Sequence, residues 1–334
     1  MAAFVISSAR ISTLAVALLV ATTISCRGAG VAAATLSNKY YDKTCPGLQP
    51  IVRSAMAQAV AADPRTGASV LRLFFHDCFV NGCDGSVLLD DAPPGFTGEK
   101  GAGPNLGSAR GFEAVDAAKA QAEAACNATV SCADVLALAA RDAVGLLGGP
   151  AWAVKLGRKD SRTASQAAAN ANLPGPGSGL SSLLASFAAK GLSARDMTAL
   201  SGAHTVGRAR CLTFRARVNG GDAGVNATFA ARIRQGCPAT NGVGDSSLAP
   251  LDGETPDAFD NGYFRGLLQQ RGLLHSDQEL FSGGGGSQDS LVRKYAGNAG
   301  MFASDFARAM VKMGGLEPAA GTPLEVRINC RKPN

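Results

Sequence analysis

The sequence predicts an all-α fold. Its apolar residues recur at the spacing of amphipathic helices almost throughout, and β-branched runs long enough for strands are nearly absent. About 300 residues follow an N-terminal leader, which is enough to bury a large core in one domain or in two closely packed halves. No internal repeat or long linker divides the chain. We therefore expect two helical halves with at most a small β-hairpin.

Helix boundaries follow from apolar spacing and from residues that favour helix ends. Ser131 with Asp134 has the pattern of a capping box, in which each side chain bonds the backbone N–H of the other residue. Ser108 is a second expected cap. A helix should end near Asn81-Gly82, because both residues tolerate the left-handed conformation. The other expected helices span residues 51–61, 108–125, 131–147, 180–189, 193–203, 259–270 and 290–313.

Residues 1–34 have the features of a secretory signal peptide. Arg10 precedes an apolar run from Ile11 to Ile24, and Ala32-Ala33-Ala34 provides a small-residue cleavage site. No other stretch is long and apolar enough to span a membrane. We therefore expect an exported protein comprising residues 35–334.

The cysteine content agrees with export. Nine cysteines become eight once Cys26 leaves with the leader, and an even number in a secreted chain favours four disulfides, although eight cysteines allow many pairings. Asn127 and Asn226 each begin a glycosylation sequon. The net charge of +6 includes two leader arginines, so the remaining chain carries +4. Such a charge suits an anionic matrix and is too weak and dispersed for nucleic acid.

The segment from Leu71 to Asp90, LRLFFHDCFVNGCDGSVLLD, has the composition of a functional site. Arg72 and His76 are four residues apart, so a helix places both on one face with Phe75 beside them. A short loop with oxygen donors, two cysteines and two glycines follows. A fixed cation, a general base and a group of oxygen ligands so close together indicate a chemical site.

Simpler interpretations compete with this one. An Arg/His pair on a helix can form an ordinary solvated face. His76, Asp77, Cys78 and Cys83 include zinc-ligand types, but the cysteine spacing is awkward for zinc and export favours a disulfide. An EF-hand that begins at Asp77 fails, because its third position is a phenylalanine and its twelfth is Leu88 instead of glutamate. A calcium loop of another kind stays open.

The second candidate segment is LSGAHTVG, residues 200–207. His204 lies where a helix is expected to end, between small residues that permit close approach of a flat group. Alone, it is as well explained as a core histidine. Together with His76, it could clamp a planar cofactor between two helical halves, one imidazole as metal ligand and the other as acid–base group. A ligating histidine needs an acceptor for its other N–H, and Asp277 is a candidate.

Seven segments together have a recognisable pattern: RLFFHDCFVNGCDGSVLL, EKGAGPNLGSARGF, VSCADVLALAARD, NANLPGP, ALSGAHTVG, TPDAFDNGYF and LLHSDQELF. They resemble the motifs of the class III secretory plant peroxidases, a haem peroxidase family. The resemblance covers the chain from Tyr41 to Cys330. It implies one haem b enclosed between the two helical halves.

The resemblance also implies a role for each residue around the haem. His76 would be the distal acid–base group, Arg72 the distal cation, and His204 the axial ligand of the iron. The supporting residues would be Phe75 at the haem edge, Asn105 and Glu99 behind His76, Asp277 as acceptor of the His204 N–H, and Pro174 at the substrate opening.

Two calcium sites are implied, each next to one of these histidines. The ligands of the first would be Asp77, Val80, Gly82, Asp84 and Ser86, and those of the second Thr205, Asp252, Thr255, Ala258 and Asp260. The implied disulfides are Cys45–Cys126, Cys78–Cys83, Cys132–Cys330 and Cys211–Cys237. Asp134 and Arg158 should form a buried ion pair. His275 matches no functional position of the family, so we expect it to be a surface residue.

The chain departs from some family members at the haem-edge opening. Gly103 and Thr213 stand where those members carry aromatic residues, and Arg210 is a candidate partner for a haem propionate. The chain ends four residues after Cys330, without the C-terminal extension of vacuolar members. That ending favours export to the cell wall or the extracellular space.

The expected function is oxidation of small phenols by hydrogen peroxide in one-electron steps, for cell-wall phenolic coupling or peroxide removal. The expected protein is a monomeric glycoprotein that contacts anionic cell-wall polysaccharide and neither nucleic acid nor membrane. Two rivals are a secreted calcium-binding or wall-binding structural protein with a decayed haem site, and a zinc hydrolase. The intact set of site residues disfavours the first rival.

Overall fold

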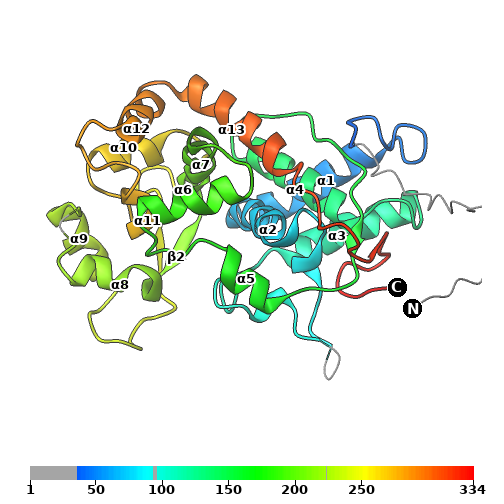
Figure 1. Cartoon of the computed structure of the whole chain (residues 1–334), viewed down its shortest axis with the longest axis horizontal. Coiled ribbons are helices and arrows are strands. Elements are labelled where there is room, and N and C mark those ends of the chain that lie inside the picture. Colours follow the sequence, from blue (N-terminus) through cyan, green and yellow to red (C-terminus); the bar gives the residue numbers. More distant parts are fainter. Residues whose placement is uncertain (1–35, 93–95, 223) are drawn as a thin grey trace, which may run out of the picture. The chain divides into compact units, whose positions relative to one another are not determined.

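The computed structural model describes residues 36–92, 96–222 and 224–334 of the chain (Figure 1). The expected signal peptide, residues 1–34, lies outside them. The predicted all-α class is confirmed, because the described residues form helices joined by loops with only two very short sheets. Within these ranges, no helix has both the length and the apolar character needed to cross a membrane.

The helices follow one another along the whole described chain. They are α1 (Leu48–Ala62), α2 (Arg65–Asn81), α3 (Phe112–Ala125), α4 (Cys132–Leu146), α5 (Gln166–Asn172), α6 (Leu180–Ala189), α7 (Ala194–Ser201), α8 (Cys211–Asn219), α9 (Ala227–Arg234), α10 (Gly262–Leu268), α11 (His275–Gln278), α12 (Ser287–Gly297) and α13 (Ala299–Met313). Three 3₁₀ turns, η1 (Ser86–Leu88), η2 (Glu99–Gly101) and η3 (Gly202–Thr205), lie between them.

Helices α1 to α4 pack together at one end of the described fold. In Figure 1 they lie opposite α8, α9, α10 and α12. Helix α2 packs on α4, and α1 packs on α3 and α4. Residues 132–140 of α4 are all buried, as in a helix surrounded by others. Most of α2 is buried too, so its few polar side chains are enclosed by protein.

A second group of helices is centred on α7, α10, α12 and α13. Its core is aromatic: the ring of Phe264 lies 5.0 Å from those of both Tyr295 and Phe302. Helix α13 also contacts α2, and one apolar core extends through both groups. A separate, smaller apolar cluster lies under α8 and α9.

The described strands form two short antiparallel pairs, and neither pair is a local hairpin. Strand β1 (Asp160–Ser161) pairs with β4 (Leu324–Glu325), and β2 (Arg208–Arg210) pairs with β3 (Leu248–Pro250), both antiparallel. Each pair joins segments that are distant in the sequence. The short strands therefore tie loops together, and local periodicity could not reveal such pairings.

Several helix boundaries differ from the predicted ones. The expected helix 290–313 is two helices, because the side chain of Asn298 accepts a hydrogen bond from Met301 N and caps α13. Helix α3 begins after Gly111 instead of at Ser108, whose hydroxyl contacts Pro104 O and Arg72. Ser131 caps α4 as expected.

Asp134 does not complete the capping box, because its carboxylate pairs with Arg158. The Arg158 guanidinium lies 2.8 Å from the carboxylate, with side-chain exposures of 5% and 0%. Tyr41 Oη and the backbone N–H of Gly157 also donate to this carboxylate, at 2.9 and 2.6 Å. Since each charge is compensated in a dry environment, loss of one partner leaves the other buried and unpaired.

The four disulfides that the resemblance implies are present: Cys45–Cys126, Cys78–Cys83, Cys132–Cys330 and Cys211–Cys237. Cys132–Cys330 links α4 to the C-terminal segment across 198 residues of sequence. Cys78–Cys83 instead closes a loop of only a few residues at the end of α2. Covalent links over long segments restrict the unfolded chain and stabilise the fold.

Replacing Arg158 with Met should reduce the free energy of unfolding by about 3–5 kcal/mol, because the Asp134 carboxylate stays buried without its cation. Urea unfolding followed by circular dichroism measures the change. The control is Arg208→Met, which breaks the 3.3 Å pair with Asp257 at 33% and 41% exposure and should cost less than about 1 kcal/mol. Equal losses in the two variants would contradict the prediction.

Candidate functional site

Helix α2 places Arg72 and His76 side by side in the interior. Arg72 Nε lies 3.2 Å from His76 Nε2, and the opposite ring nitrogen, Nδ1, lies 2.5 Å from Asn105 Oδ1. His76 is only 7% exposed. Arg72 is also held by the carbonyl of Pro104 and the hydroxyl of Ser108, at 2.6 and 3.1 Å. The loop after η2 thus fixes both side chains of the helix.

Hydrogen bonding assigns the tautomer of His76. Asn105 Nδ2 donates to the backbone carbonyl of Glu99 at 2.9 Å, so Asn105 Oδ1 faces the imidazole as an acceptor. His76 Nδ1 must therefore carry the proton, and the lone pair lies on Nε2, where it accepts a hydrogen bond from Arg72 Nε in this structure and can serve as a base. Glu99 supports Asn105 through its backbone, while burial raises the pKa of its own carboxyl group to about 7.

Burial, the largest effect, and the positive charge of Arg72 both lower the pKa of His76, while the Asn105 hydrogen bond raises it by less, and together these effects bring the pKa to about 3. Burial also lowers the pKa of Arg72, to about 10, so this guanidinium remains charged at neutral pH. A neutral base therefore stands beside a permanent cation, as proton abstraction and stabilisation of a developing anion require.

Phe75 lies on the same helix as this pair and is half-buried. Its ring stacks with Phe187 at 6.1 Å and lies 4.7 Å from Phe79. The ring therefore extends an aromatic wall from α6 to the side of His76, where its own centroid lies 5.8 Å from the imidazole.

His204 lies in the turn η3, directly after α7. Its Nδ1 is 2.7 Å from Asp277 Oδ1, and Asp277 is 3% exposed. Since the carboxylate can only accept, Nδ1 donates and Nε2 is left for another partner. The imidazole itself is 39% exposed. This is the arrangement of a metal-ligating histidine whose second nitrogen is held by a carboxylate.

One residue of this region was missed in the sequence. Tyr263 Oη donates to the same Asp277 oxygen at 3.2 Å, and its ring is perpendicular to the His204 imidazole at 6.0 Å. The tyrosine lies within the TPDAFDNGYF motif, but neither its spacing nor its polarity signalled a contact with Asp277.

The oxygen donors after His76 lie close together, as the loop sequence suggests. Asp77, Asp84 and Ser86 are at most 1% exposed. Burial raises the pKa of Asp77 well above its ordinary value, an effect that the charge of Asp84 increases, and burial raises the pKa of Asp84 to about 6. Val80 lies in the last turn of α2 and Gly82 directly follows this helix, and the Val80 carbonyl accepts from Lys190 Nζ at 2.9 Å.

A second group of oxygens surrounds Thr205. The Thr205 hydroxyl lies 3.4 Å from Asp252 Oδ2 and 3.1 Å from Asp260 Oδ1, and the Thr255 hydroxyl lies 3.2 and 3.0 Å from the same two carboxylates. Ala258, expected to add a carbonyl, is exposed in the same loop. Among the described residues, no three His, Cys, Asp or Glu side chains converge as a metal site. Both groups rely instead on two carboxylates together with hydroxyls.

The zinc interpretation is wrong, because Cys78 and Cys83 are joined to each other in a disulfide. The assignment of His275 to a plain surface role also needs correction. Its Nδ1 lies 3.0 Å from Asp222 and its Nε2 lies 3.4 Å from Glu279, so it bridges two carboxylates at 39% exposure.

Of the residues expected at the substrate opening, Pro174 and Gly103 lie in loops, and Thr213 lies in the first turn of α8. Pro174 is half-buried between α5 and α6, and Gly103 N donates to Asn170 Oδ1 at 2.8 Å. The Thr213 hydroxyl donates to the carbonyl of Arg210 at 2.7 Å. Arg210 itself reaches the Leu106 carbonyl at 3.2 Å, so β2 is tied to the loop that carries Asn105.

The two sequons lie in different settings. Asn127 is exposed after α3, as an acceptor for a glycan must be. Asn226 is half-buried, and its Oδ1 accepts from Phe229 N at 3.0 Å, so it caps α9.

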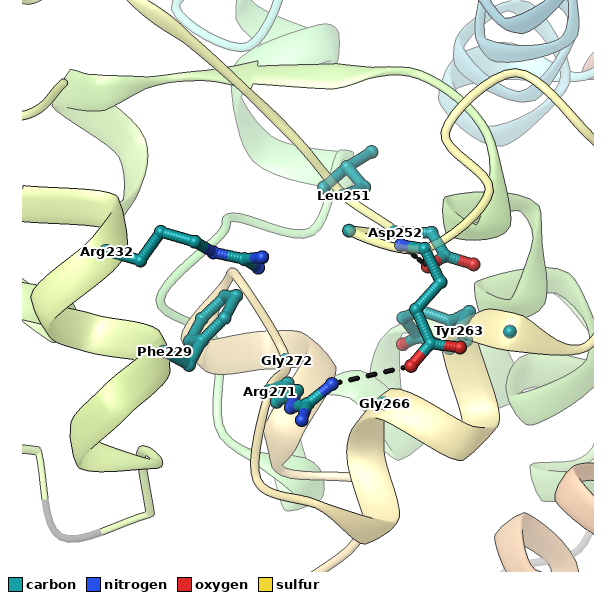
Figure 2. Close-up of a pocket in the computed structure, with 11 residues that line it drawn as sticks. Phe229, Arg232, Leu251, Asp252, Tyr263, Gly266, Arg271 and Gly272 are labelled. Carbon is teal, nitrogen blue, oxygen red and sulfur yellow. Dashed lines mark hydrogen bonds and ion pairs between the residues drawn. The ribbon is translucent and has the colours of Figure 1, made fainter. Parts of the chain in front are cut away.

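A pocket with a volume of about 50 Å³ is lined by Tyr263, by residues of α9 and by residues of the loop before α10 (Figure 2). Phe229, Leu251 and Tyr263 contribute apolar surface to it, and Arg232 and Arg271 contribute positive charge. Arg271 is paired with Glu254 at 3.4 Å.

Comparison with known proteins gives consistent matches. The family described as peroxidase matches residues 52–298. Peroxidase P7 of Brassica rapa subsp. rapa is 56% identical over 299 residues, 90% of this chain and 100% of that protein. Peroxidase 70 of Zea mays is 55% identical over 306 residues, 92% of this chain and 94% of that protein. Peroxidase 22.3 of Oryza sativa subsp. japonica is 52% identical over 328 residues, 98% of this chain and 99% of that protein.

Replacing Arg72 with Leu should raise the pKa of His76 from about 3, because the change removes the neighbouring positive charge while the imidazole stays buried. The wild-type imidazole should remain neutral throughout the range from pH 8 to pH ~4. Since its folded-state pKa lies below 6.5, its contribution to folding stability is present above pH 6.5 and is lost as the pH falls from 6.5 towards 3. NMR titration of isotope-labelled histidine in the cofactor-free protein measures the pKa, and an unchanged midpoint in the variant would contradict the electrostatic explanation.

Proposed function

The chain belongs to the peroxidase family, and from this premise we propose how its own residues carry out the reaction. It is a haem peroxidase of the plant class III type, an oxidoreductase that uses hydrogen peroxide. The observation that carries the assignment of residues is the pair of fixed imidazoles. His76 is held by Asn105 and His204 by Asp277, each through Nδ1.

The residues around His204 fit an iron-bound haem. Its Nδ1 is committed to a buried carboxylate, so the available donor atom is Nε2, the nitrogen that an axial ligand uses. When bound, the haem supplies the redox chemistry that no side chain of this region can perform. Asp277 draws the Nδ1 proton of His204 towards itself, which makes the imidazole a stronger electron donor.

His76 acts on the peroxide as a base and then as an acid. Its neutral Nε2 accepts a proton from one oxygen of the peroxide. The resulting imidazolium gives this proton to the other oxygen, which leaves as water. The pKa of about 3 keeps this nitrogen unprotonated at physiological pH. Asn105 holds the ring in the tautomer that both transfers need.

Arg72 stabilises the negative charge that develops on the departing oxygen. Its guanidinium is fixed by Pro104 O and Ser108, so little reorganisation is needed during the reaction. Phe75 limits access on the flank of His76, so that donors reach the haem edge near Pro174 instead of the peroxide site. Gly103 and Thr213 leave that opening without aromatic rings, which favours small phenols of varied shape.

Two calcium ions are part of the proposal. The first would be bound by the Asp77 and Asp84 carboxylates, the Ser86 hydroxyl and the carbonyls of Val80 and Gly82. Calcium would stabilise the ionised forms of two buried carboxylates whose pKa values burial otherwise raises. Lys190, which donates to the Val80 carbonyl, would be a neighbour of this ion.

The second calcium would be bound at Thr205, Asp252, Thr255, Ala258 and Asp260. The convergence of two hydroxyls and two carboxylates supports this placement. Asp77 and Thr205 directly follow the two site histidines, so each ion would fix the backbone beside one imidazole.

Several wider properties rest on the sequence. We propose a secreted monomer that is glycosylated at Asn127 and Asn226 and acts on phenols in the cell wall. Its mildly basic surface would favour contact with anionic polysaccharide. Eight cysteines paired in four disulfides support an oxidising compartment.

His76→Leu should retain haem and its Soret absorption but slow the reaction with hydrogen peroxide by roughly 10⁴-fold or more. A single acid–base group is typically worth ~10²–10⁴-fold, and His76 serves in both proton transfers. Stopped-flow absorbance after mixing with peroxide measures the rate. His275→Gln removes the one other described histidine outside the site and should react like the wild type. A His76→Leu rate within about tenfold of wild type would falsify the role, and a wild-type protein without a Soret band would refute the function.

Prolonged chelation should release two calcium ions, lower activity and shift the Soret band, while the helical circular dichroism is largely kept. The oxygen ligands adjoin His76 and His204, whereas the four disulfides continue to hold the scaffold. Elemental analysis gives the calcium content, and added calcium should restore the spectrum. Full activity in a protein shown to contain no calcium excludes this proposal.

A further inference from the structure

Tyr263 and His204 compete for one oxygen of Asp277. His204 Nδ1 lies 2.7 Å and Tyr263 Oη 3.2 Å from Asp277 Oδ1, while the other oxygen, Oδ2, accepts from Leu274 N at 3.0 Å. All three groups are donors and the carboxylate is the common acceptor. Asp277 is therefore surrounded by hydrogen bonds from the turn η3, from α10 and from its own helix, α11.

Tyr263 can only be a neutral donor in this position. The side chain is 3% exposed, and burial raises its pKa well above the ordinary value, an effect that the Asp277 charge increases. The phenol therefore keeps its proton at neutral pH. A neutral O–H that donates to a carboxylate forms a charge-assisted hydrogen bond, stronger than one between neutral groups.

Packing fixes the direction of this hydroxyl. The ring of Tyr263 is perpendicular to the His204 imidazole at 6.0 Å and meets Phe264 edge-on at 5.0 Å. Figure 2 shows Tyr263 lining the pocket beside Asp252. The ring of Tyr263 thus lines this pocket while its hydroxyl donates to Asp277 Oδ1.

We propose that Tyr263 is a positioning residue that sets the strength of the His204–Asp277 hydrogen bond and thereby the electron donation of His204 to the haem iron. Each donor to a carboxylate stabilises its negative charge and lowers its affinity for further protons. The Tyr263 hydroxyl therefore weakens the attraction of Asp277 for the Nδ1 proton and keeps His204 closer to a neutral imidazole. This inference rests on the proposed role of His204 as axial ligand.

The direction of the effect follows from the shared oxygen. Without the hydroxyl, Asp277 Oδ1 has one donor instead of two and binds the Nδ1 proton more strongly. His204 then gains imidazolate character, binds iron more tightly and stabilises its oxidised state. Removal of Tyr263 Oη should consequently make the iron harder to reduce.

Tyr263→Phe in the haem-loaded protein tests the proposal, because the ring and its packing remain and only the hydroxyl is lost. We expect the ferric/ferrous reduction potential to shift in the negative direction and the iron–histidine stretching frequency of the ferrous protein to rise, as measured by spectroelectrochemistry and resonance Raman spectroscopy. In the cofactor-free protein, the NMR signal of the His204 Nδ1 proton should move downfield, which reports a stronger hydrogen bond without any activity measurement.

Tyr295→Phe is the matched control. Tyr295 is also fully buried and donates to a carboxylate, Asp305, at 2.7 Å, but it lies on α12 and has no contact with Asp277. This variant should leave the potential, the stretching frequency and the His204 signal unchanged, even where it reduces stability.

The two possible failures are distinguishable. If both variants show a Soret band and have the same iron–histidine frequency and reduction potential, the role of Tyr263 is overturned. The proposed function is not affected by that result. A positive shift of the potential in Tyr263→Phe also overturns it, because the hydroxyl would then serve to hold Asp277 in place for His204. Wild-type protein that binds no haem at His204 refutes the proposed function itself.

Discussion

The hydrogen bond at Nδ1 of each site histidine is the interaction on which the rest of the site depends. Asn105 Oδ1 binds this atom in His76, and Asp277 Oδ1 binds it in His204. Each bond fixes a tautomer and leaves Nε2 as the atom that can react or coordinate. The acceptors differ in charge. The acceptor of His76 is a neutral amide, and burial and Arg72 keep this imidazole a weak base with a pKa of about 3. The acceptor of His204 is a carboxylate, which makes that imidazole a stronger donor of electrons to a bound metal.

The two acceptors lie far from the histidines in the sequence, and the fold brings them into contact. Asn105 lies in the loop after η2, 29 residues from His76, and Asp277 lies in α11, 73 residues from His204. Helix α2 contacts η1 and α5, which both contact η2, the turn before Asn105, and α10 contacts η3 and bonds Asp277 through Tyr263. The long-range disulfides and the buried Asp134–Arg158 pair stabilise the same arrangement, because they connect α4 with the C-terminal segment and with the loop before β1.

Burial of charge is a recurring feature of the structure around both histidines. Asp77, Asp84, Asp252 and Asp277 are all nearly inaccessible to solvent. Asp277 accepts hydrogen bonds from three donors, whereas Asp77 lies so close to Asp84 that this second charge adds to burial in raising the pKa of Asp77. A positive charge would offset the desolvation of the carboxylates in both oxygen-rich groups. The proposed calcium ions would supply that charge beside His76 and His204. The catalytic geometry and the stability of these loops would then depend on the same ions.

The sequence by itself determined the all-α class, the cysteine framework through its family resemblance, and the identity of the main site residues. Arg72 and His76 are separated by one helical turn and His204 lies in a short motif, so the sequence singled them out as candidates, and the family resemblance supplied their expected roles. The sequence did not determine that Asn298 divides one expected helix or that β1 joins β4, and the Asp134–Arg158 pair was expected only from the family resemblance. It also gave no sign of the contact between Tyr263 and Asp277. These features depend on contacts between residues far apart in the chain, and only the packing of the helices decides which of many buried polar groups meet.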